Sequence, residues 1–238
     1  TNKEKFIFRG DELRRRQFIA GMSIEDLELI LHPMVEDIKE AVGSMGDDTP
    51  VAVLSDMYRP LSHFFRQNFS QVTNPPIDSL RENEVMSLKT RFGNTGNILD
   101  FENLTKENIY VLESPVLSNS QFEKFSEFFK ENIRVLDCTF NISGSLKKRL
   151  DELRLEAETA VREGCKHLIL SDKEINEKKS SIPMALTIGA INSKLINLGI
   201  RGFASINVQT CEVLDTHSFA VLLGVGATTI NPYIAFDS

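Results

Sequence analysis

Two neighbouring carboxylates, Asp47 and Asp48, lie in a glycine-rich turn within the stretch AVGSMGDDTPVAVLSD, residues 41–56. Carboxylate oxygens are ligands for hard cations, so a metal site is one interpretation. However, neighbours in sequence rarely converge on one ion, and no second acidic cluster has the spacing of a known metal motif. Asp47, Asp48 and Thr49 are equally suited to bonding their own backbone in a turn. We therefore favour a structural role for this acidic turn.

The histidines and cysteines do not suggest a metal centre or a nucleophile. None of the four histidines has the HxxxH, HExxH or HxE spacing of a zinc site. The cysteines lie far apart in apolar surroundings, which predicts buried free thiols in a reducing compartment. These residues are His32, His63, His167 and His217, with Cys138, Cys165 and Cys211.

Polar side chains stand where apolar strands are expected to end. Ser171 and Asp172 close the run LILSD, Gln209 closes the next strand, and His217 begins the helix that follows. Because ligands bind at the carboxyl ends of parallel strands, these residues define one candidate ligand site. The evidence is positional only, and capping or packing is the commoner role of a residue placed like His217.

The elements that would position these residues alternate regularly in the second half of the chain. Continuous apolar runs predict strands at 134–140, 167–172, 202–210 and 228–236, with helices at 145–164, 181–199 and 215–226 between them. Gly224 and Gly226 end a helix and precede a strand. The glycines of a dinucleotide-binding loop instead follow a strand and precede a helix. Short connections and apolar strands predict an α/β fold with a parallel sheet buried on both faces, or a partial barrel.

The first half of the chain is less regular. The sequence predicts a helix from Ser23 to Gly43 that Pro33 bends or breaks, a buried strand at 50–56, and a helix begun by Pro60 at 60–72. The charged residues 1–22, including RRRQ, suit a tether or a solvated helix face, although they could bind an anion. We divide the chain into this tether, a mainly helical part at 23–130 and regular βα units at 131–238, packed as one unit.

The composition limits the partners. The 238 residues carry a net charge of -7 with a pI near 5.3, so no basic face is expected for nucleic acid or an anionic membrane. The apolar runs are too short to span a bilayer, and the N-terminus lacks a signal peptide, which favours the cytoplasm. Thr1 without a start methionine suggests a chain cut from something longer.

Several long segments, taken in order, resemble the central domain of the large subunit of glutamate synthase. They are AVGSMGDDTPVAVLSD, FRQNFSQVTNPPIDSLRENEVMSL, LESPVLSN, LILSD, IPMALTIGAI and FAVLLGVGATTINPYIAF. The resemblance runs from about Arg14 to Ser238. It implies a rudimentary, incomplete TIM-barrel-like domain of parallel βα units with a helical N-terminal part.

The resemblance implies a piece of a larger oxidoreductase that makes glutamate from glutamine and 2-oxoglutarate. The central domain of this family joins a glutaminase domain to a domain that binds flavin mononucleotide (FMN) and a 3Fe-4S cluster, with a small subunit as a further candidate partner. The resemblance implies neither a cofactor nor a catalytic residue in this fragment. The electron donor, NADPH, NADH or ferredoxin, is left open.

In this family, the segments GSMGDDTP and QVTNPP face the neighbouring domains near the passage for ammonia. The resemblance therefore assigns an interdomain or passage role to Ser44, Met45, Gly46, Asp47, Asp48, Thr49, Gln71, Val72, Thr73, Asn74 and Pro75. A conduit for neutral ammonia excludes water, which suits rigid glycine and proline backbone and an apolar methionine. We expect Met45 and Thr73 to lie nearest the passage.

The sequence departs from the family pattern in the barrel-like half. Asn192-Ser193 replaces a histidine pair, His217-Ser218-Phe219 replaces HHF, and residues 209–212 read QTCE instead of ESGE. These changes weaken a ligand site there. The alternatives to a connecting domain are a free-standing barrel-like enzyme that binds flavin or a small molecule through Ser171, Asp172, Gln209 and His217, and a regulatory binding module.

Overall fold

The computed structural model describes residues 4–40, 46, 49–50, 52–56, 59–66, 78–93, 99 and 109–238. Contacts divide the chain into two compact units, Thr1–Asn68 with Val116–Ser238, and Phe69–Pro115. Sequence reasoning expected a single unit. Residues 69–115 are inserted in the chain between the two parts of the larger unit.

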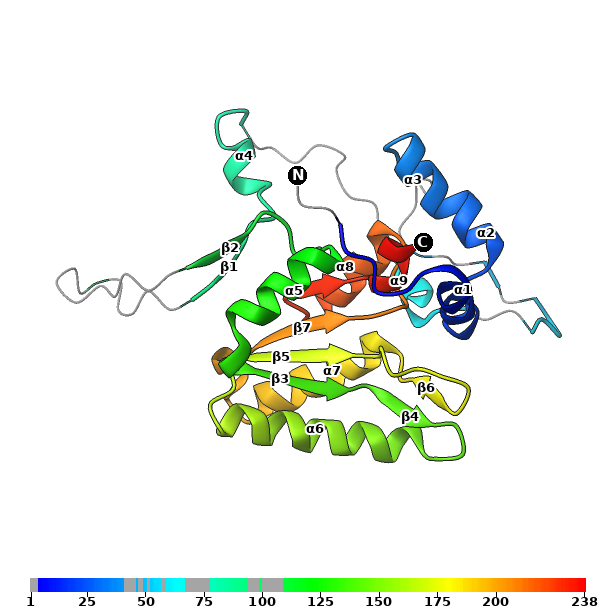
Figure 1. Ribbon diagram of the computed structural model, residues 1–238. Coiled ribbons are helices and arrows are strands. Elements are labelled where there is room, and N and C mark those ends of the chain that lie inside the picture. Colours follow the sequence, from blue (N-terminus) through cyan, green and yellow to red (C-terminus); the bar gives the residue numbers. More distant parts are fainter. Residues whose placement is uncertain are drawn as a thin grey trace. The chain divides into compact units, whose positions relative to one another are not determined.

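The smaller unit contains α4 (Glu82–Val85) and an antiparallel pair, β1 (Thr90–Phe92) and β2 (Tyr110–Leu112). The elements of the larger unit follow in chain order in Figure 1. They are α1 (Gly10–Ile19), α2 (Ile24–Asp26), η1 (Leu27–Leu31), α3 (His32–Glu36), η2 (Leu61–Phe64), α5 (Asn119–Phe128), η3 (Lys130–Asn132), β3 (Ile133–Asp137), β4 (Thr139–Asn141), α6 (Leu146–Arg162), β5 (His167–Ser171), β6 (Lys179–Ser181), α7 (Met184–Asn197), η4 (Arg201–Phe203), β7 (Ser205–Gln209), α8 (Thr216–Gly224), β8 (Thr229–Asn231) and α9 (Tyr233–Asp237).

A parallel four-stranded sheet with the order β3-β5-β7-β8 confirms the α/β fold. The chain at Val116 adds a parallel bridge to Ile230, and the Leu117 N–H donates to the Ile230 carbonyl over 2.8 Å. Within the described residues the sheet does not close into a barrel. A separate antiparallel pair, β4 and β6, follows the ends of β3 and β5.

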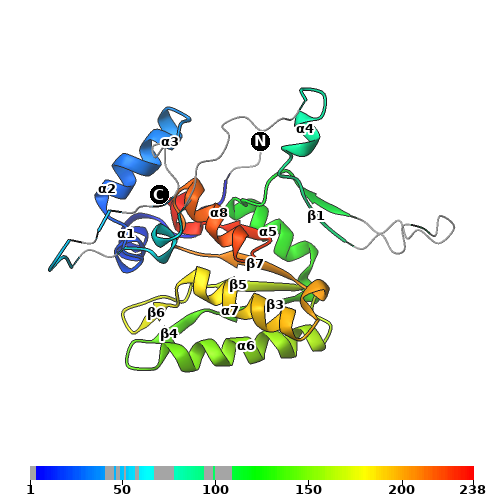
Figure 2. The same cartoon turned by 180° about the vertical axis from the view of Figure 1, so that it is seen from behind.

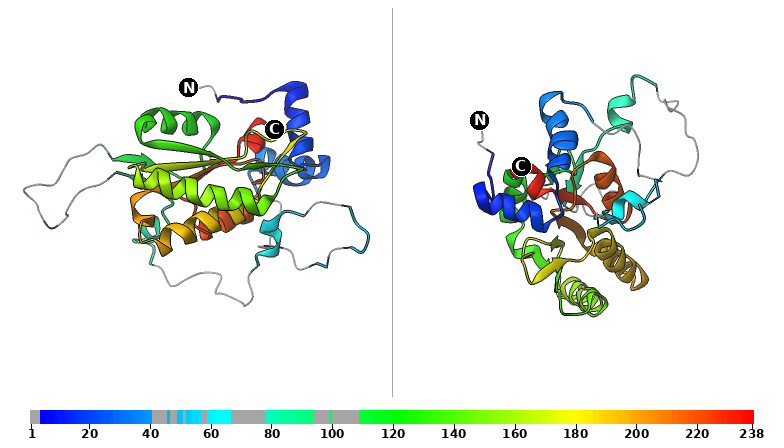
Figure 3. Two further views of the ribbon diagram at one scale, coloured as in Figure 1. Left: turned by 90° about the horizontal axis from the view of Figure 1, so that it is seen from below. Right: turned by 90° about the vertical axis from the view of Figure 1, so that its right-hand side faces the viewer.

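The two faces of the sheet differ in chemistry. Leu136, Leu170, Val208 and Ile230 lie in one register row and pack in the core with α6 and α7. Figures 2 and 3 show these two helices side by side on that face. On the opposite face, α5 brings Phe125 and Phe129 against the ring of His167, with centroids 5.6 and 4.1 Å away.

Local sequence signals explain the helices around this sheet. Ser145 and Asp215 cap α6 and α8, accepting hydrogen bonds from Lys148 N over 3.3 Å and Ser218 N over 2.8 Å. Gly164 and Gly199 adopt φ values of 93° and 70° just beyond α6 and α7. A left-handed residue at this place is the usual end of a helix, so these expected boundaries are confirmed.

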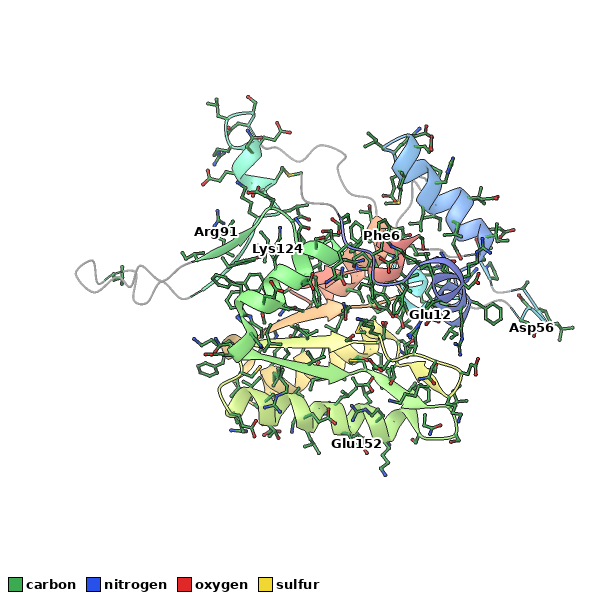
Figure 4. All side chains as sticks on the ribbon, in the orientation of Figure 1. Phe6, Glu12, Asp56, Arg91, Lys124 and Glu152 are labelled. Atoms are coloured by element: carbon green, nitrogen blue, oxygen red, sulfur yellow. The ribbon has the colours of Figure 1, made fainter. Side chains whose placement is uncertain are left out.

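Three local expectations are wrong. Residues 52–56, expected in a buried strand, form a turn in which Val53 and Leu54 are 90% and 96% exposed; Asp56 of this turn is labelled in Figure 4. The last strand ends at Asn231, because Pro232 interrupts the ladder and begins α9. The expected helix from Pro60 is a short 3-10 turn, η2; residues 67–72 of that expectation lie outside the described residues.

Pro33 does not break its helix. The backbone stays helical from Ile24 to Glu36, but η1 is a π-helical turn that directly precedes the turn containing Pro33. A π-turn shifts the hydrogen-bond register by one residue, which accommodates a residue without an N–H group. The helix ends at Glu36, seven residues before the Gly43 end expected from the sequence, and Gly43 lies outside the described residues.

Candidate functional site

Of the eleven residues assigned to an interdomain or passage role, the structure describes Gly46 and Thr49. The other nine, Ser44, Met45, Asp47, Asp48, Gln71, Val72, Thr73, Asn74 and Pro75, lie outside the described residues. Gly46 has φ of 80°, and a Cβ there would lie 2.2 Å from the Phe65 carbonyl oxygen. The position therefore requires glycine, both for its backbone angle and for its close approach to residues 65–66.

A second contact holds the same loop. The Thr49 carbonyl oxygen accepts a hydrogen bond from Arg59 Nη1 over 2.7 Å. Gly46 and Thr49 thus lie against the segment 59–66, which leads in sequence toward the second assigned segment, 71–75. Gly46 and Thr49, the described residues of the first assigned segment, therefore contact the residues that precede the second assigned segment in the chain.

Thr49 also lines a cavity of about 480 Å³. Its walls come from the α1–α2 connection and the helical turns after it, from described residues between Thr49 and His63, and from the chain after β7 as far as Ser218. Glu212 and Asp215 line the cavity after β7, and Arg59 and His63 are also among its lining residues. The cavity thus lies at the carboxyl end of a parallel strand, where ligands of α/β sheets bind.

Glu212 connects this cavity to the end of α7. One carboxylate oxygen accepts from Met184 N over 2.9 Å at the first residue of α7, and the other from Ser181 Oγ over 3.4 Å. Burial, together with the nearby charge of Asp172, raises the pKa of Glu212 to about 7, while the Met184 N–H opposes the shift. Glu212 can therefore hold or release a proton near neutral pH.

Asp172 is fully buried directly after β5. Its carboxylate accepts from Thr210 Oγ1 over 2.6 Å and from Cys211 N over 3.1 Å, and the Cys211 thiol lies 3.6 Å away. Burial raises the pKa of Asp172 to about 6, although these hydrogen bonds stabilise the ionised form. Burial also raises the pKa values of Cys138, Cys165 and Cys211, so their thiols stay protonated and unreactive.

The sequence-based rival site is only partly assembled. Ser171 Oγ donates to Gln209 Oε1 over 3.0 Å, and Gln209 Nε2 donates to Asn231 Oδ1 over 3.2 Å, so these polar groups satisfy one another. His217 Nε2 instead donates to the Ser62 carbonyl oxygen over 2.8 Å. Among the described residues, no hydrogen bond joins His217 to Ser171, Asp172 or Gln209.

The described residues do not fit a metal or an iron–sulfur cluster. They contain no group of three or more His, Cys, Asp and Glu side chains able to hold a metal ion. Cys138 follows β3, Cys165 precedes β5 and Cys211 follows β7, whereas a cluster needs several thiolates together. No helix in the described part of the chain is long and apolar enough to cross a membrane.

Sequence reasoning missed Glu212 as a site residue. The signal that selected Ser171 and Asp172, a polar residue just after an apolar strand, applies equally to residues 209–212. Only the fold shows that Glu212 both caps α7 and lines a cavity with Thr49.

Comparisons with known proteins all identify glutamate synthases as the proteins to which this chain is similar. A family model described as the glutamate synthase central domain matches residues 15–238. The chain is 56% identical over 230 residues to the glutamate synthase [NADPH] large chain of Azospirillum brasilense, covering 95% of this chain and 15% of that protein. It is 42% identical over 238 residues to the chloroplastic ferredoxin-dependent glutamate synthase 2 of Arabidopsis thaliana, covering 98% and 14%. It is 39% identical over 227 residues to the glutamate synthase [NADPH] large chain of Bacillus subtilis, covering 94% and 15%.

The chain therefore spans about 15% of the length of the curated relatives it matches. The names of these relatives include both NADPH and ferredoxin, so the similarity does not select an electron donor for this chain.

Proposed function

Because this chain belongs to the glutamate synthase central domain family, we propose that it connects the glutaminase and FMN-binding domains of a glutamate synthase large chain. In this proposal it also forms part of an internal passage that carries ammonia from glutamine to 2-oxoglutarate. The match across residues 15–238 is the observation that carries the proposal. FMN and the 3Fe-4S cluster belong to the parent enzyme and are held outside this chain.

The residues around the first assigned segment support an interdomain role. Gly46 requires glycine, because it has a positive φ and because a Cβ there would collide with residues 65–66. Thr49 lines a cavity at the carboxyl end of the sheet. A constrained backbone position and a cavity suit a conduit, since the wall of a conduit must exclude bulk water.

The finer architecture follows from the same premise. The parallel strands and their outer helices form an incomplete TIM-barrel-like domain, with the chain at Val116 as an additional strand beside β8. A small subunit is a further partner, and the cytoplasm is the compartment of the parent enzyme. The assigned residues without a structural description, Met45 and Thr73 above all, remain passage residues in this proposal.

The test uses Met45→Lys in the complete large chain. A lysine adds a charge with its bound water to an apolar wall, so glutamine-dependent glutamate synthesis should fall by roughly tenfold, equal to about 1.4 kcal/mol of added barrier. Synthesis from added ammonia should be retained, because ammonia can reach the second site from solution. Rates with glutamine and with ammonia are measured side by side.

Leu155→Lys is the matched control, because Leu155 is 60% exposed on α6, remote in sequence from the assigned segments. It should leave both rates unchanged. Unchanged glutamine-dependent synthesis in Met45→Lys, with glutamine hydrolysis still matched to glutamate formation, would remove Met45 from the passage.

A further inference from the structure

The N-terminal segment and the last helix meet at one carboxylate. Asp237 Oδ2 accepts from Phe8 N over 2.8 Å and Ile7 N over 3.1 Å, and Oδ1 accepts from Asn119 Nδ2 over 2.7 Å. Asp237 is only 4% exposed although it is the penultimate residue of the chain. Figure 1 shows the N-terminal segment running beside α9, and Figure 4 labels Phe6 and Glu12 along it. Residues 230 positions apart are thus joined by hydrogen bonds.

The same carboxylate is connected to the sheet. Asn119, whose amide donates to Asp237, accepts from Asn231 Nδ2 over 2.9 Å. Asn231 accepts in turn from Gln209, which accepts from Ser171. A continuous line of buried or partly buried hydrogen bonds therefore runs from residue 8 to the carboxyl ends of β8, β7 and β5. Such a network is rigid because each member is satisfied by the next.

Apolar and cationic contacts hold the N-terminal segment in the same place. The Phe8 ring lies 6.1 Å from that of Tyr233 in α9, and the Arg16 guanidinium lies 4.5 Å over Phe8. Arg16 Nη1 also donates to the carbonyl oxygens of Lys173 and Ile175 over 2.7 and 2.9 Å. Gln17 reaches the last residue, with Nε2 donating to Ser238 Oγ over 2.8 Å.

The carboxylate of Asp237 makes the contacts of the N-terminal segment stronger than hydrogen bonds between neutral groups. Hydrogen bonds to an ionised acceptor are roughly twice as strong as neutral ones, and removing the charge from a buried acceptor leaves several donors poorly paired. Asp237, in the last helix, accepts hydrogen bonds both from the N-terminal segment and from the start of α5. The N-terminal segment and the last helix therefore share one buried carboxylate.

We propose that Asp237 is a positioning residue that couples the domain before this chain to the domain after it. The inference rests on the proposed connecting function and deepens it by naming the residue that transmits the coupling. In the parent enzyme, the contact keeps glutamine hydrolysis in step with use of ammonia at the second site. Asp237 does not touch a reacting atom and takes no part in bond making.

The test is Asp237→Asn in the complete large chain, with two readouts. The amide group places an NH₂ donor against the donors of Ile7, Phe8 and Asn119, so hydrogen exchange at the Ile7 and Phe8 amides should rise about tenfold. The ratio of glutamine hydrolysed to glutamate formed should rise above the unsubstituted value. Synthesis from added ammonia should stay unchanged, which separates lost coupling from damage to the second site.

Asp151→Asn is the matched control, because Asp151 is an exposed carboxylate paired with Arg154 on α6. It should change neither readout. Asp237→Glu keeps the charge but displaces it by one methylene. If Asp237→Asn does not fold, Asp237→Glu tests whether Asp237 couples glutamine hydrolysis to glutamate formation. An altered hydrolysis ratio in Asp237→Glu, with normal thermal stability, supports the proposal.

Two results would overturn the proposal. Faster exchange at residues 7 and 8 with a normal hydrolysis ratio would mean that Asp237 only stabilises the fold. Normal exchange would mean that the contact does not hold the N-terminal segment. This test is independent of the proposed ammonia passage. If Asp237→Asn alters the hydrolysis ratio while Met45→Lys has no effect, the coupling proposal stands and the passage proposal fails.

Discussion

The fold moves the pKa values of the buried residues Asp172 and His167 and of the partly buried Glu212 in different directions. Burial raises the pKa of Glu212 to about 7 and that of Asp172 to about 6. Burial lowers the pKa of His167 to about 4, and its Nδ1 lies 2.8 Å from Ser205 Oγ. All three shifts have the same cause, because a poorly solvated site disfavours the charged form of either an acid or a base.

We predict that Glu212 makes the chain less stable as pH rises from about 4.5 to about 7. Its folded pKa is above the unfolded value, so the folded state binds the proton more tightly and the stabilisation is complete below pH 4.5. The loss should reach roughly 3.5 kcal/mol, since the pKa rises by about 2.5 units and each unit corresponds to about 1.4 kcal/mol. Urea unfolding at several pH values measures it.

Glu212→Gln should remove this loss while keeping an acceptor for Met184 N. The comparison is between the substituted and unsubstituted chains at each pH, because His167 contributes in the opposite sense below pH 6.5. Glu131→Gln, at an exposed position, is the control and should leave the profile unchanged. Parallel profiles for Glu212→Gln and the unsubstituted chain would contradict the prediction.

At the scale of elements, α6 shows how a sequence pattern becomes a packed face. Its buried residues are Leu153, Ala157, Ala160 and Val161, which recur at the three- and four-residue intervals of a helix. Leu155 lies between them in sequence yet is 60% exposed, because it falls on the other side of the same helix. The helix therefore contains its own matched pair of leucines.

We predict that Leu153→Ala costs about 2–5 kcal/mol in the free energy of unfolding, the usual range for a fully buried leucine. Leu155→Ala should change it by no more than about 0.5 kcal/mol. Urea denaturation of the two variants and the unsubstituted chain gives both values. Equal costs for the two substitutions would contradict the packing of α6 against the sheet.

The elements that the sequence predicted poorly are those that lack this repetition. The apolar side chains of residues 52–56 suggested a strand. A strand of a parallel sheet needs neighbouring strands to hydrogen-bond with, and this segment forms an exposed turn instead. At Pro33 the sequence predicted a bend or break, and the helix does not break, because a π-turn keeps it continuous. Both outcomes depend on hydrogen-bond partners that a local pattern does not specify.

At the scale of the larger unit, residues 4–22 cover apolar side chains at the carboxyl end of the sheet. Ile175, Cys211, Tyr233 and Ile234 form a cluster against which Ile7, Phe8, Leu13, Ile19, Ala20 and Met22 pack. The same segment supplies the donors for Asp237. A segment with these contacts contributes to stability as well as to connection.

We predict that a chain lacking residues 1–22 unfolds at lower urea concentration and binds the dye ANS, because the cluster around Tyr233 becomes exposed. The loss should be at least about 2 kcal/mol, given that burial of one large apolar side chain contributes about 1.5–3 kcal/mol. Removing the four N-terminal residues alone is the control and should have a small effect. If residues 1–22 were only a tether, the urea concentration at the unfolding midpoint would be the same with and without them, and the prediction would be wrong.

The sequence by itself determined the family, the alternating second half and the helix ends at Gly164 and Gly199, because these depend on contiguous residues and local backbone preference. The tertiary structure alone decided that residues 69–115 form a separate unit, that Glu212 lines a cavity with Thr49, and that Asp237 binds residues 7 and 8. Burial and charge pairing between residues up to 230 positions apart depend on the path of the chain in space. No periodicity or motif spacing records that path.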